Sequence, residues 1–317
     1  MYIKIETIMK KIFLSFAAMV MAAGILSAQD INAVTEIYNN GAMELDMGNK
    51  EVALEHFQNA LTAAEALGDE GADIAANCQT YIPAIMIQIA KGQLKENALD
   101  EAIETLGKAA EAGNAFGNPD VVAEAASLTS QAYLAKGNNA LNAKDFETAV
   151  SAYQIVLAEN PANGLAQLRL GMALGALGKT EEAEAAYLLA AENGQQKGAF
   201  KQLSNIYVKY AQAANKAKNF QEAYDLALKS NEYLENANAC RIAAGAAQQL
   251  KKNDECIAFY EKYIALKPNA KDAGGVKFTI AALYQQAGNK EKAKEYYQMV
   301  AGDPQYGPSA AEQLKNL

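Results

Sequence analysis

Residues 178–191 read GKTEEAEAAYLLAA, and this stretch indicates how the chain folds. It opens with a turn signal, because glycine adopts the backbone angles that end one helix and threonine caps the next. A small residue, Ala183, is followed four positions later by the bulky Tyr187. Side chains four apart share one helix face, so the alanine lets a neighbouring helix approach and the tyrosine fills the space beside it. The stretch therefore predicts the turn and the second helix of a helical hairpin.

The same pattern returns along the chain at intervals of 33 to 49 residues, which is typical of a repeat array. Twelve residues before each small anchor residue stands a second small residue or alanine, which faces the anchor across the hairpin. The anchors are Ala53, Ala102, Ala149, Ala183, Ala223, Cys256 and Ala293. Their partners in the first helices are Gly41, Ala90, Gly137, Gly171, Ala211, Ala244 and Ala281.

The best-matched copy places Leu170-Gly171 before Ala183 and Tyr187, and a closing proline follows two of the anchors by twelve residues, as Pro161 and Pro268. This order resembles the signature of the tetratricopeptide repeat, although the tryptophan of that signature is missing. The resemblance covers about residues 34–305. It implies an all-α, right-handed superhelical solenoid of about seven helical hairpins.

The N-terminus has the three-part layout of a secretory signal peptide. Met9-Lys10-Lys11 is basic, residues 12–26 are apolar and uncharged, and Ala28 precedes polar sequence. We therefore expect residues 1–28 to be a signal peptide, with residues 1–8 as a possible upstream extension. Because no cysteine lies near the cleavage point, we expect a soluble periplasmic or extracellular protein without a lipid anchor.

Three further segments follow from how closely the repeats match. Residues 29–129 are expected to form divergent hairpins with long helices, and Pro83 predicts a kink or a new helix start there. Residues 130–305 hold the better-matched repeats. Residues 306–317 are expected to form a C-terminal helix that caps the last repeat.

Charge and cysteine content exclude several classes of protein. The chain has 28 basic and 37 acidic side chains, and 25 and 36 without residues 1–28, which gives a formal charge of −11. Such a chain repels phosphate backbones and anionic lipid surfaces, so we expect neither nucleic acid nor a membrane surface as partner. The odd set Cys78, Cys240 and Cys256 argues against a disulfide scaffold and indicates core filling.

Nothing in the sequence indicates catalysis, a cofactor or a metal. Residues 173–180 meet the loose form of a phosphate-binding loop, but a helical pattern precedes them where that loop requires a strand. His56 is the only histidine, so no multi-histidine metal site is expected. We expect a protein that is not an enzyme and has no cofactor.

The inner face of the first helices is the predicted binding surface, because such helices line a concave groove in repeat arrays. That face carries both arginines of this acidic chain, together with lysine and amide side chains. Some members of the family clamp a partner's C-terminal carboxylate there, but of those positions only Asn138 is identical here and Lys209 keeps the charge. The predicted groove residues are Asn138, Asn142, Arg169, Asn205, Lys209, Gln212, Lys216, Arg241, Gln248, Gln249 and Gln285.

The expected function is a scaffold that binds a protein or an extended peptide, including one with carboxylates, in this groove. One alternative is a structural subunit of a cell-envelope assembly or secretion complex, which would use its outer faces or ends. Glycan binding is a further alternative, although this chain has neither the exposed tryptophans nor the lipid anchor usual for it.

Export gives the first testable prediction. Because the leader carries a basic segment, an apolar segment and a small residue before the cut, we expect the mature protein to begin near Gln29. N-terminal sequencing of protein from the producing cell measures this. Protein that keeps residues 1–28 and stays in the cytoplasm would contradict the export hypothesis.

Overall fold

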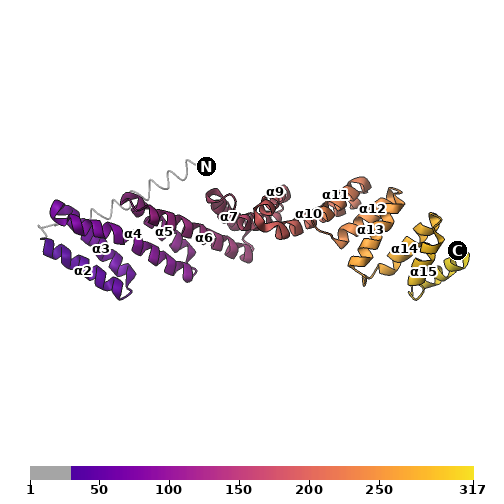
Figure 1. The fold of residues 1–317 in the computed structure, drawn as a ribbon, viewed down its shortest axis with the longest axis horizontal. Helices are drawn as coiled ribbons and strands as arrows, with labels where there is room; N and C mark the ends of the chain where they lie inside the picture. Colours follow the sequence, from indigo (N-terminus) through magenta and orange to yellow (C-terminus); the bar gives the residue numbers. More distant parts are fainter. Residues whose placement is uncertain (1–29) are drawn as a thin grey trace. The chain divides into compact units, whose positions relative to one another are not determined.

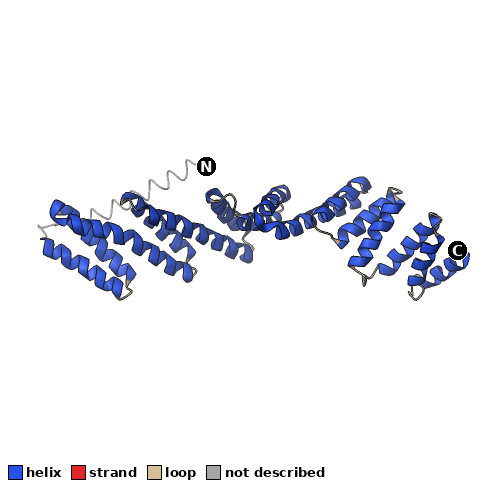
Figure 2. Ribbon diagram, viewed as in Figure 1, coloured by secondary structure: helices blue, strands red, loops and turns tan. Residues whose placement is uncertain are grey.

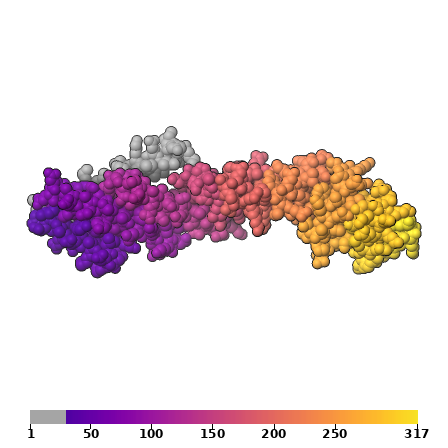
Figure 3. Space-filling model, viewed as in Figure 1, coloured from indigo at the N-terminus to yellow at the C-terminus, as the bar shows by residue number. Residues whose placement is uncertain are grey.

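The structure is a computed structural model that describes residues 30–317, so the predicted signal peptide lies outside the described residues. Figure 2 shows that all regular elements in residues 30–317 are helices, with no strand among them. The chain divides into two compact units at Ala135 and Lys136, inside α6 (Pro119–Ala143). The colours of Figure 3 follow the sequence through both units. The change of repeat character expected near residue 129 rests on sequence similarity and stays a prediction.

The first unit consists of two long hairpins followed by the greater part of α6. Its helices are α2 (Ile31–Asp46), α3 (Lys50–Ala66), the short 3-10 helix η2 (Gly68–Gly71), α4 (Ala72–Lys95) and α5 (Leu99–Ala115). Pro83 lies inside α4 and is buried, and no new helix starts there, so that part of the expectation was wrong.

The second unit continues from the end of α6 with helices that pair in chain order (Figure 1). These helices are α7 (Phe146–Glu159), α8 (Gly164–Ala176), α9 (Thr180–Ala190), a π-helical turn η3 (Ala191–Gln195), α10 (Gln196–Lys216), α11 (Phe220–Tyr233), α12 (Ala237–Gln249), α13 (Asn253–Leu266), α14 (Ala273–Gln286), α15 (Lys290–Met299) and α16 (Gly307–Asn316). With α2 to α6 they make seven successive hairpins and a final helix, so the predicted all-α array of hairpins is confirmed.

All seven hairpin turns use the same backbone device. The last residue before the second helix's cap has a positive φ, and the next N–H donates to a carbonyl five residues earlier, as from Lys179 to Leu174. This bond satisfies a carbonyl that the end of the first helix leaves without a partner. The positive-φ residues are Gly48, Asn97, Lys144, Gly178, Lys218, Lys251 and Gly288.

The small anchors and their partners form the inside of each hairpin. All seven anchors have no exposed surface, and the seven facing residues are buried as well. Among the three facing glycines, Gly171 of α8 leaves the least space, because Tyr187 of α9 lies against it. A Cβ added at Gly171 would lie 2.6 Å from Cε1 of the Tyr187 ring, a separation that atoms in contact do not adopt. Glycine is therefore required there, as it is at Gly137, where Tyr153 occupies the same place.

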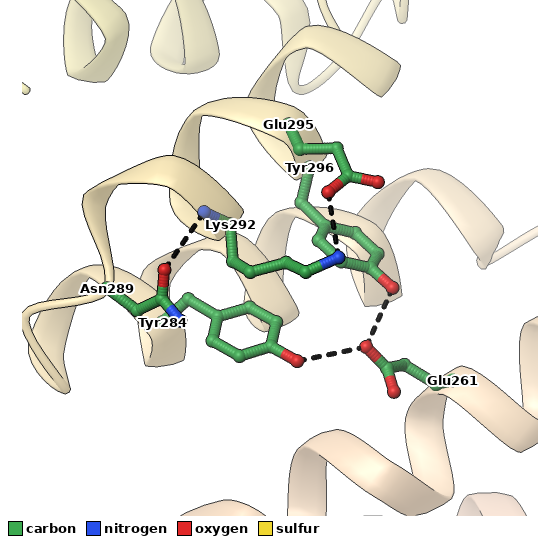
Figure 4. A network of polar contacts seen from close by, with 6 residues as sticks. All are labelled: Glu261, Tyr284, Asn289, Lys292, Glu295 and Tyr296. Carbon is green, nitrogen blue, oxygen red and sulfur yellow. Dashed lines mark hydrogen bonds and ion pairs between the residues drawn. The ribbon is translucent and has the colours of Figure 1, made fainter.

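Neighbouring hairpins of the second unit are joined by polar contacts as well as by apolar ones. Figure 4 shows Glu261 of α13 accepting hydrogen bonds from Tyr284 of α14 at 3.1 Å and from Tyr296 of α15 at 2.8 Å. Beside them Lys292 pairs with Glu295 at 2.9 Å, and Asn289 caps α15 (Figure 4). One carboxylate thus ties the sixth hairpin to both helices of the seventh.

The buried cysteines fill the core. All three are free thiols without exposed surface, and burial raises the pKa of Cys78 and of Cys256 to about 11. At neutral pH they are therefore protonated and weakly nucleophilic. Among residues 30–317, no helix combines the length and the apolar character needed to span a bilayer.

The second prediction compares two glycines of α8. We expect Gly171→Ala to lower the thermal midpoint, because its Cβ would force the Tyr187 ring out of place at a cost of about 1–3 kcal/mol. Gly175→Ala is the matched control, since a Cβ there meets nothing closer than 3.8 Å. It should raise the midpoint slightly, by a helix-propensity gain of roughly 0.5–1 kcal/mol. Circular dichroism melts measure the thermal midpoints of both variants. Equal midpoints for Gly171→Ala and Gly175→Ala would contradict the proposed packing.

Candidate binding groove

Three neighbouring hollows lie along the first helices of the second unit. The Lys209 hollow, of about 410 Å³, is lined by α8, α9 and α10, with Thr180, Tyr187, Asn205 and Lys209 among its residues. The Lys216 hollow, of about 370 Å³, lies between α10 and α12. The Tyr260 hollow, of about 440 Å³, adds α13 and α14. The last two share Asn215, Arg241 and Ile242, and α10 lines all three, so we treat them as one groove.

The charge of this groove is opposite to that of the chain. Its lining cations are Lys209, Lys216 and Arg241, and the one carboxylate that lines any of these three hollows is Asp272. Amide side chains supply most of the other polar atoms, including Asn205, Gln212, Asn215 and Asn238. Amides can donate to and accept from a peptide backbone, and lysine and arginine attract carboxylates. The arrangement is suited to an extended chain with acidic side chains.

Arg241 already has a carboxylate partner. Its Nε lies 2.6 Å from Oδ2 of Asp272, and the Tyr263 hydroxyl donates to the other oxygen of that carboxylate, also at 2.6 Å. Burial alone would raise the pKa of Asp272, but the Tyr263 hydrogen bond and the charge of Arg241 outweigh it and lower the pKa. The Arg241 side chain is still 58% exposed. Asp272 therefore orients the guanidinium through one nitrogen while much of the group faces solvent.

The predicted groove residues separate into two sets. Asn205, Lys209, Gln212, Lys216 and Arg241 line the hollows. The other predicted residues, Asn138, Asn142, Arg169, Gln248, Gln249 and Gln285, do not line these three hollows.

Two residues of the second set are held by tyrosines of the core. The Tyr153 hydroxyl donates to Asn138 at 2.9 Å, and the Tyr297 hydroxyl donates to Gln285 at 2.8 Å. Arg169 also lies against Tyr153: burial raises the pKa of that phenol, while the charge of Arg169 and a hydrogen bond from it act in the opposite direction. The Nε of Arg169 is buried without a hydrogen-bond partner among the described residues. These side chains contribute to contacts within the array.

Several lining residues were missed from the sequence. The sequence predicts only a packing role for Tyr187, yet the residue also lines the Lys209 hollow, and Tyr260 lines the Tyr260 hollow in the same way. The register set by the small residues of the first helices does not include Asn215 or Asn238. Asn215 lies three residues after Gln212, and residues three apart share a helix face. Groove positions counted along the whole of α10 therefore include Asn215.

The two units differ strongly in charge. Residues 30–135 carry 17 acidic and 4 basic side chains, a formal charge of −13. Residues 136–317 carry 19 acidic and 21 basic side chains, a formal charge of +2. His56 lies in the first unit and is partly buried. Within residues 30–317, no three His, Cys, Asp or Glu side chains are grouped as metal ligands would be.

Three segments match the family model of the tetratricopeptide repeat: residues 166–193, 238–270 and 275–299. They span the hairpins α8–α9, α12–α13 and α14–α15. The chain therefore contains tetratricopeptide repeats in these segments, and the resemblance seen in the sequence is confirmed there. Proteins built from these repeats are generally non-catalytic and present extended concave binding surfaces, so the chain is, in general terms, a protein-interaction scaffold.

Similar solved structures include two of MamA and one of the PilF protein of Pseudomonas aeruginosa. The crystal structure of MamA protein is 20% identical and covers 57% of this chain and 94% of its own, with a TM-score of 0.35. The MamA AMB-1 structure is 21% identical and covers 56% of this chain and 93% of its own, with a TM-score of 0.38. The PilF structure is 19% identical and covers 59% of this chain and 90% of its own, with a TM-score of 0.30. No curated protein matches the sequence.

The third prediction concerns the Arg241–Asp272 pair. Because the pKa of Asp272 is lowered in the folded protein, the pair stabilises the fold above the ordinary aspartate pKa of about 4 and loses this effect as pH falls through the lowered value. Both side chains are more than a third exposed, so the effect is small, about 0.2–1 kcal/mol. Asp272→Asn, which can still accept from Tyr263, should therefore melt below the parent at pH 6 and level with it at pH 2. If the variant melts below the parent by the same amount at pH 6 and at pH 2, the result would contradict this assignment.

Proposed function

We propose that this protein is exported and binds an extended segment of a partner protein in the groove formed by α8, α10, α12 and α14. The observation that carries the proposal is the charge of the groove: three cations line it in a chain whose described residues have a net charge of −11. Its single carboxylate, Asp272, is engaged by Arg241 and Tyr263. A partner segment with acidic side chains fits this chemistry.

The setting follows from the predicted leader. A protein with a cleaved signal peptide works in the periplasm or outside the cell, and the partner is then a protein of the same compartment. The amide side chains of the groove would bind the partner backbone, and the cations would select its charge.

A second function is favoured by a separate observation, the formal charge of −13 on residues 30–135. A unit with this surface suits a structural subunit of a cell-envelope assembly, which contacts basic neighbours through its outer faces. The two functions place the partner on different surfaces, so crosslinking can separate them.

The fourth prediction tests the groove. Lys216→Ala with Arg241→Ala should weaken partner binding at least tenfold, because loss of a hydrogen-bonded charge contact typically costs about 2–5 kcal/mol. The matched control is Lys197→Ala with Lys201→Ala, which removes the same charge from exposed positions of α10 outside the three hollows. Pulldown from extracts of the producing cell's envelope, with melts of each variant, measures the effect.

A photo-crosslinking residue locates the partner. At Asn215, which lines two hollows, it should crosslink a partner, and the Lys216/Arg241 variant should lose that product. At Glu55, an exposed residue of α3 in the acidic first unit, it should not. Crosslinks from Glu55 alone, or equal recovery by the groove variant and the control, would sink the groove proposal and favour the structural subunit.

A further inference from the structure

The outer faces of α7 and α9 expose large apolar side chains outside the groove. Ile155 of α7 is 44% exposed, and Leu188 and Leu189 of α9 are 38% and 48% exposed. None of these three residues lines any of the three hollows. The solvent-facing side of a surface helix normally carries charged or polar residues, so these side chains indicate a surface that another molecule covers.

The register of the repeat shows how these two helices differ from the others. The position six residues after each anchor is exposed, and it holds asparagine in α3 and lysine in α5, α11 and α13. In α5 this lysine, Lys108, pairs with Glu104 at 2.7 Å. The same position holds Ile155 in α7 and Leu189 in α9, and the last hairpin has Met299 there. The third and fourth hairpins, which are neighbours, therefore both have an apolar residue where most others have a polar one.

A chain of hydrogen bonds holds the two helices in place. Both α7 and α9 pack against α8. Asn193 of η3 donates through Nδ2 to Oε1 of Gln167 at 3.1 Å, and Gln167 donates through Nε2 to the carbonyl of Pro161 at 2.6 Å. Gln167 is buried, so these bonds connect the end of α9, the start of α8 and the loop after α7 in a site of low dielectric. Leu165 adds a further exposed apolar side chain at this junction, and the surface is preformed.

Carboxylates flank the apolar surface. Glu159 lies one turn after Ile155, Glu192 lies one turn after Leu188, and both carboxylates belong to exposed residues. Neither α7 nor α9 contains a lysine or an arginine. Opposite charges across an interface favour association and like charges oppose it. The covering molecule should therefore be apolar at its centre and basic at its edges.

A second copy of this chain does not meet that requirement. Residues 30–135 have a formal charge of −13. The second helices of residues 136–317 together carry 13 acidic and 5 basic side chains, so two outer faces would repel each other. The charge of the surface instead points to a different, basic protein.

We propose that the outer faces of α7 and α9 bind an amphipathic helix of a basic partner protein. The apolar stripe of that helix covers Ile155, Leu188 and Leu189, and lysine or arginine side chains beside the stripe meet Glu159 and Glu192. A helix presents side chains three and four residues apart as one apolar stripe with charged flanks, which matches an apolar surface between carboxylates. Because this surface lies outside the groove, its binding is independent of the proposed groove function.

The probe is the synthetic amphipathic peptide KLAKLLKKLAKLLK, with one leucine replaced by a photoreactive leucine. One matched peptide has glutamate in place of every lysine, and a second has the same composition in an order that gives no apolar stripe. After irradiation of the purified protein, mass spectrometry locates the crosslinks. The crosslink yield on α7 and α9, followed against peptide concentration, gives the affinity of this surface alone. We expect saturable crosslinks on both helices and binding of the two matched peptides that is weaker by about tenfold or more.

Two double variants test the apolar contacts. Ile155→Ser with Leu189→Ser should weaken binding by about tenfold or more, because two apolar side chains are no longer covered. The matched control is Leu266→Ser with Met299→Ser, which removes two side chains of similar exposure from α13 and α15. The control should bind like the parent. All four side chains are exposed, so both variants should fold, and circular dichroism melts check this.

Two further variants test the charges. Glu159→Gln with Glu192→Gln should weaken binding by roughly threefold or more, because two exposed ion pairs to the peptide are lost. Glu222→Gln with Glu232→Gln removes the same charge from exposed positions of α11 and should leave the affinity of this surface unchanged.

Crosslinks confined to residues 30–135 or to the groove would overturn the docking surface, as would equal affinities for the Ile155/Leu189 variant and its control. Analytical ultracentrifugation tests the other occupant. A dimer of the parent that the Ile155/Leu189 variant cannot form would show that a second copy covers this surface, and would also overturn the proposal. The groove function is tested separately, because its crosslink from Asn215 depends on Lys216 and Arg241, which lie outside α7 and α9.

Discussion

The structure depends on one steric relation, the close approach of a small residue in the first helix of each hairpin to an anchor and a bulky residue in the second. Where the bulky residue is Tyr187, the facing position tolerates only glycine, because a single methyl group would overlap the ring. This contact fixes the distance and the register of the two helices. Both properties then determine which side chains of the first helix face outward into the groove.

The same relation explains why tyrosine is useful here. A phenylalanine would fill the space between the helices equally well, but the phenol extends its hydroxyl past the small facing residue to polar side chains of the first helix. In two hairpins that hydroxyl meets an amide, Asn138 or Gln285. A packing residue thus becomes part of the polar surface on which a partner could lie.

Much of this could be predicted from the sequence. Anchors such as Ala183 and Cys256 are recognisable because burial requires small residues at a fixed spacing, and these contacts are local. The groove was predicted only in part, because partners from other helices decide whether a polar side chain is available. Arg169 and Arg241 are both predicted from the sequence to lie on the groove face, yet one lies against Tyr153 and the other pairs with Asp272. Neither partner is visible without the fold.

The hairpin turns have a consequence for how the array yields under stress. Three turns place glycine at the positive-φ position, whereas Lys144, Lys218 and Lys251 hold that backbone conformation at φ values of 60° to 63° with a full side chain. Each such lysine stores about 1 kcal/mol of backbone strain. In an array whose stability is a sum over neighbouring hairpins, such sites are local weak points. The third, fifth and sixth hairpins would therefore fray at their turns before the array unfolds, and each fraying turn would let a trypsin-like protease bind the backbone beside a lysine that is already exposed.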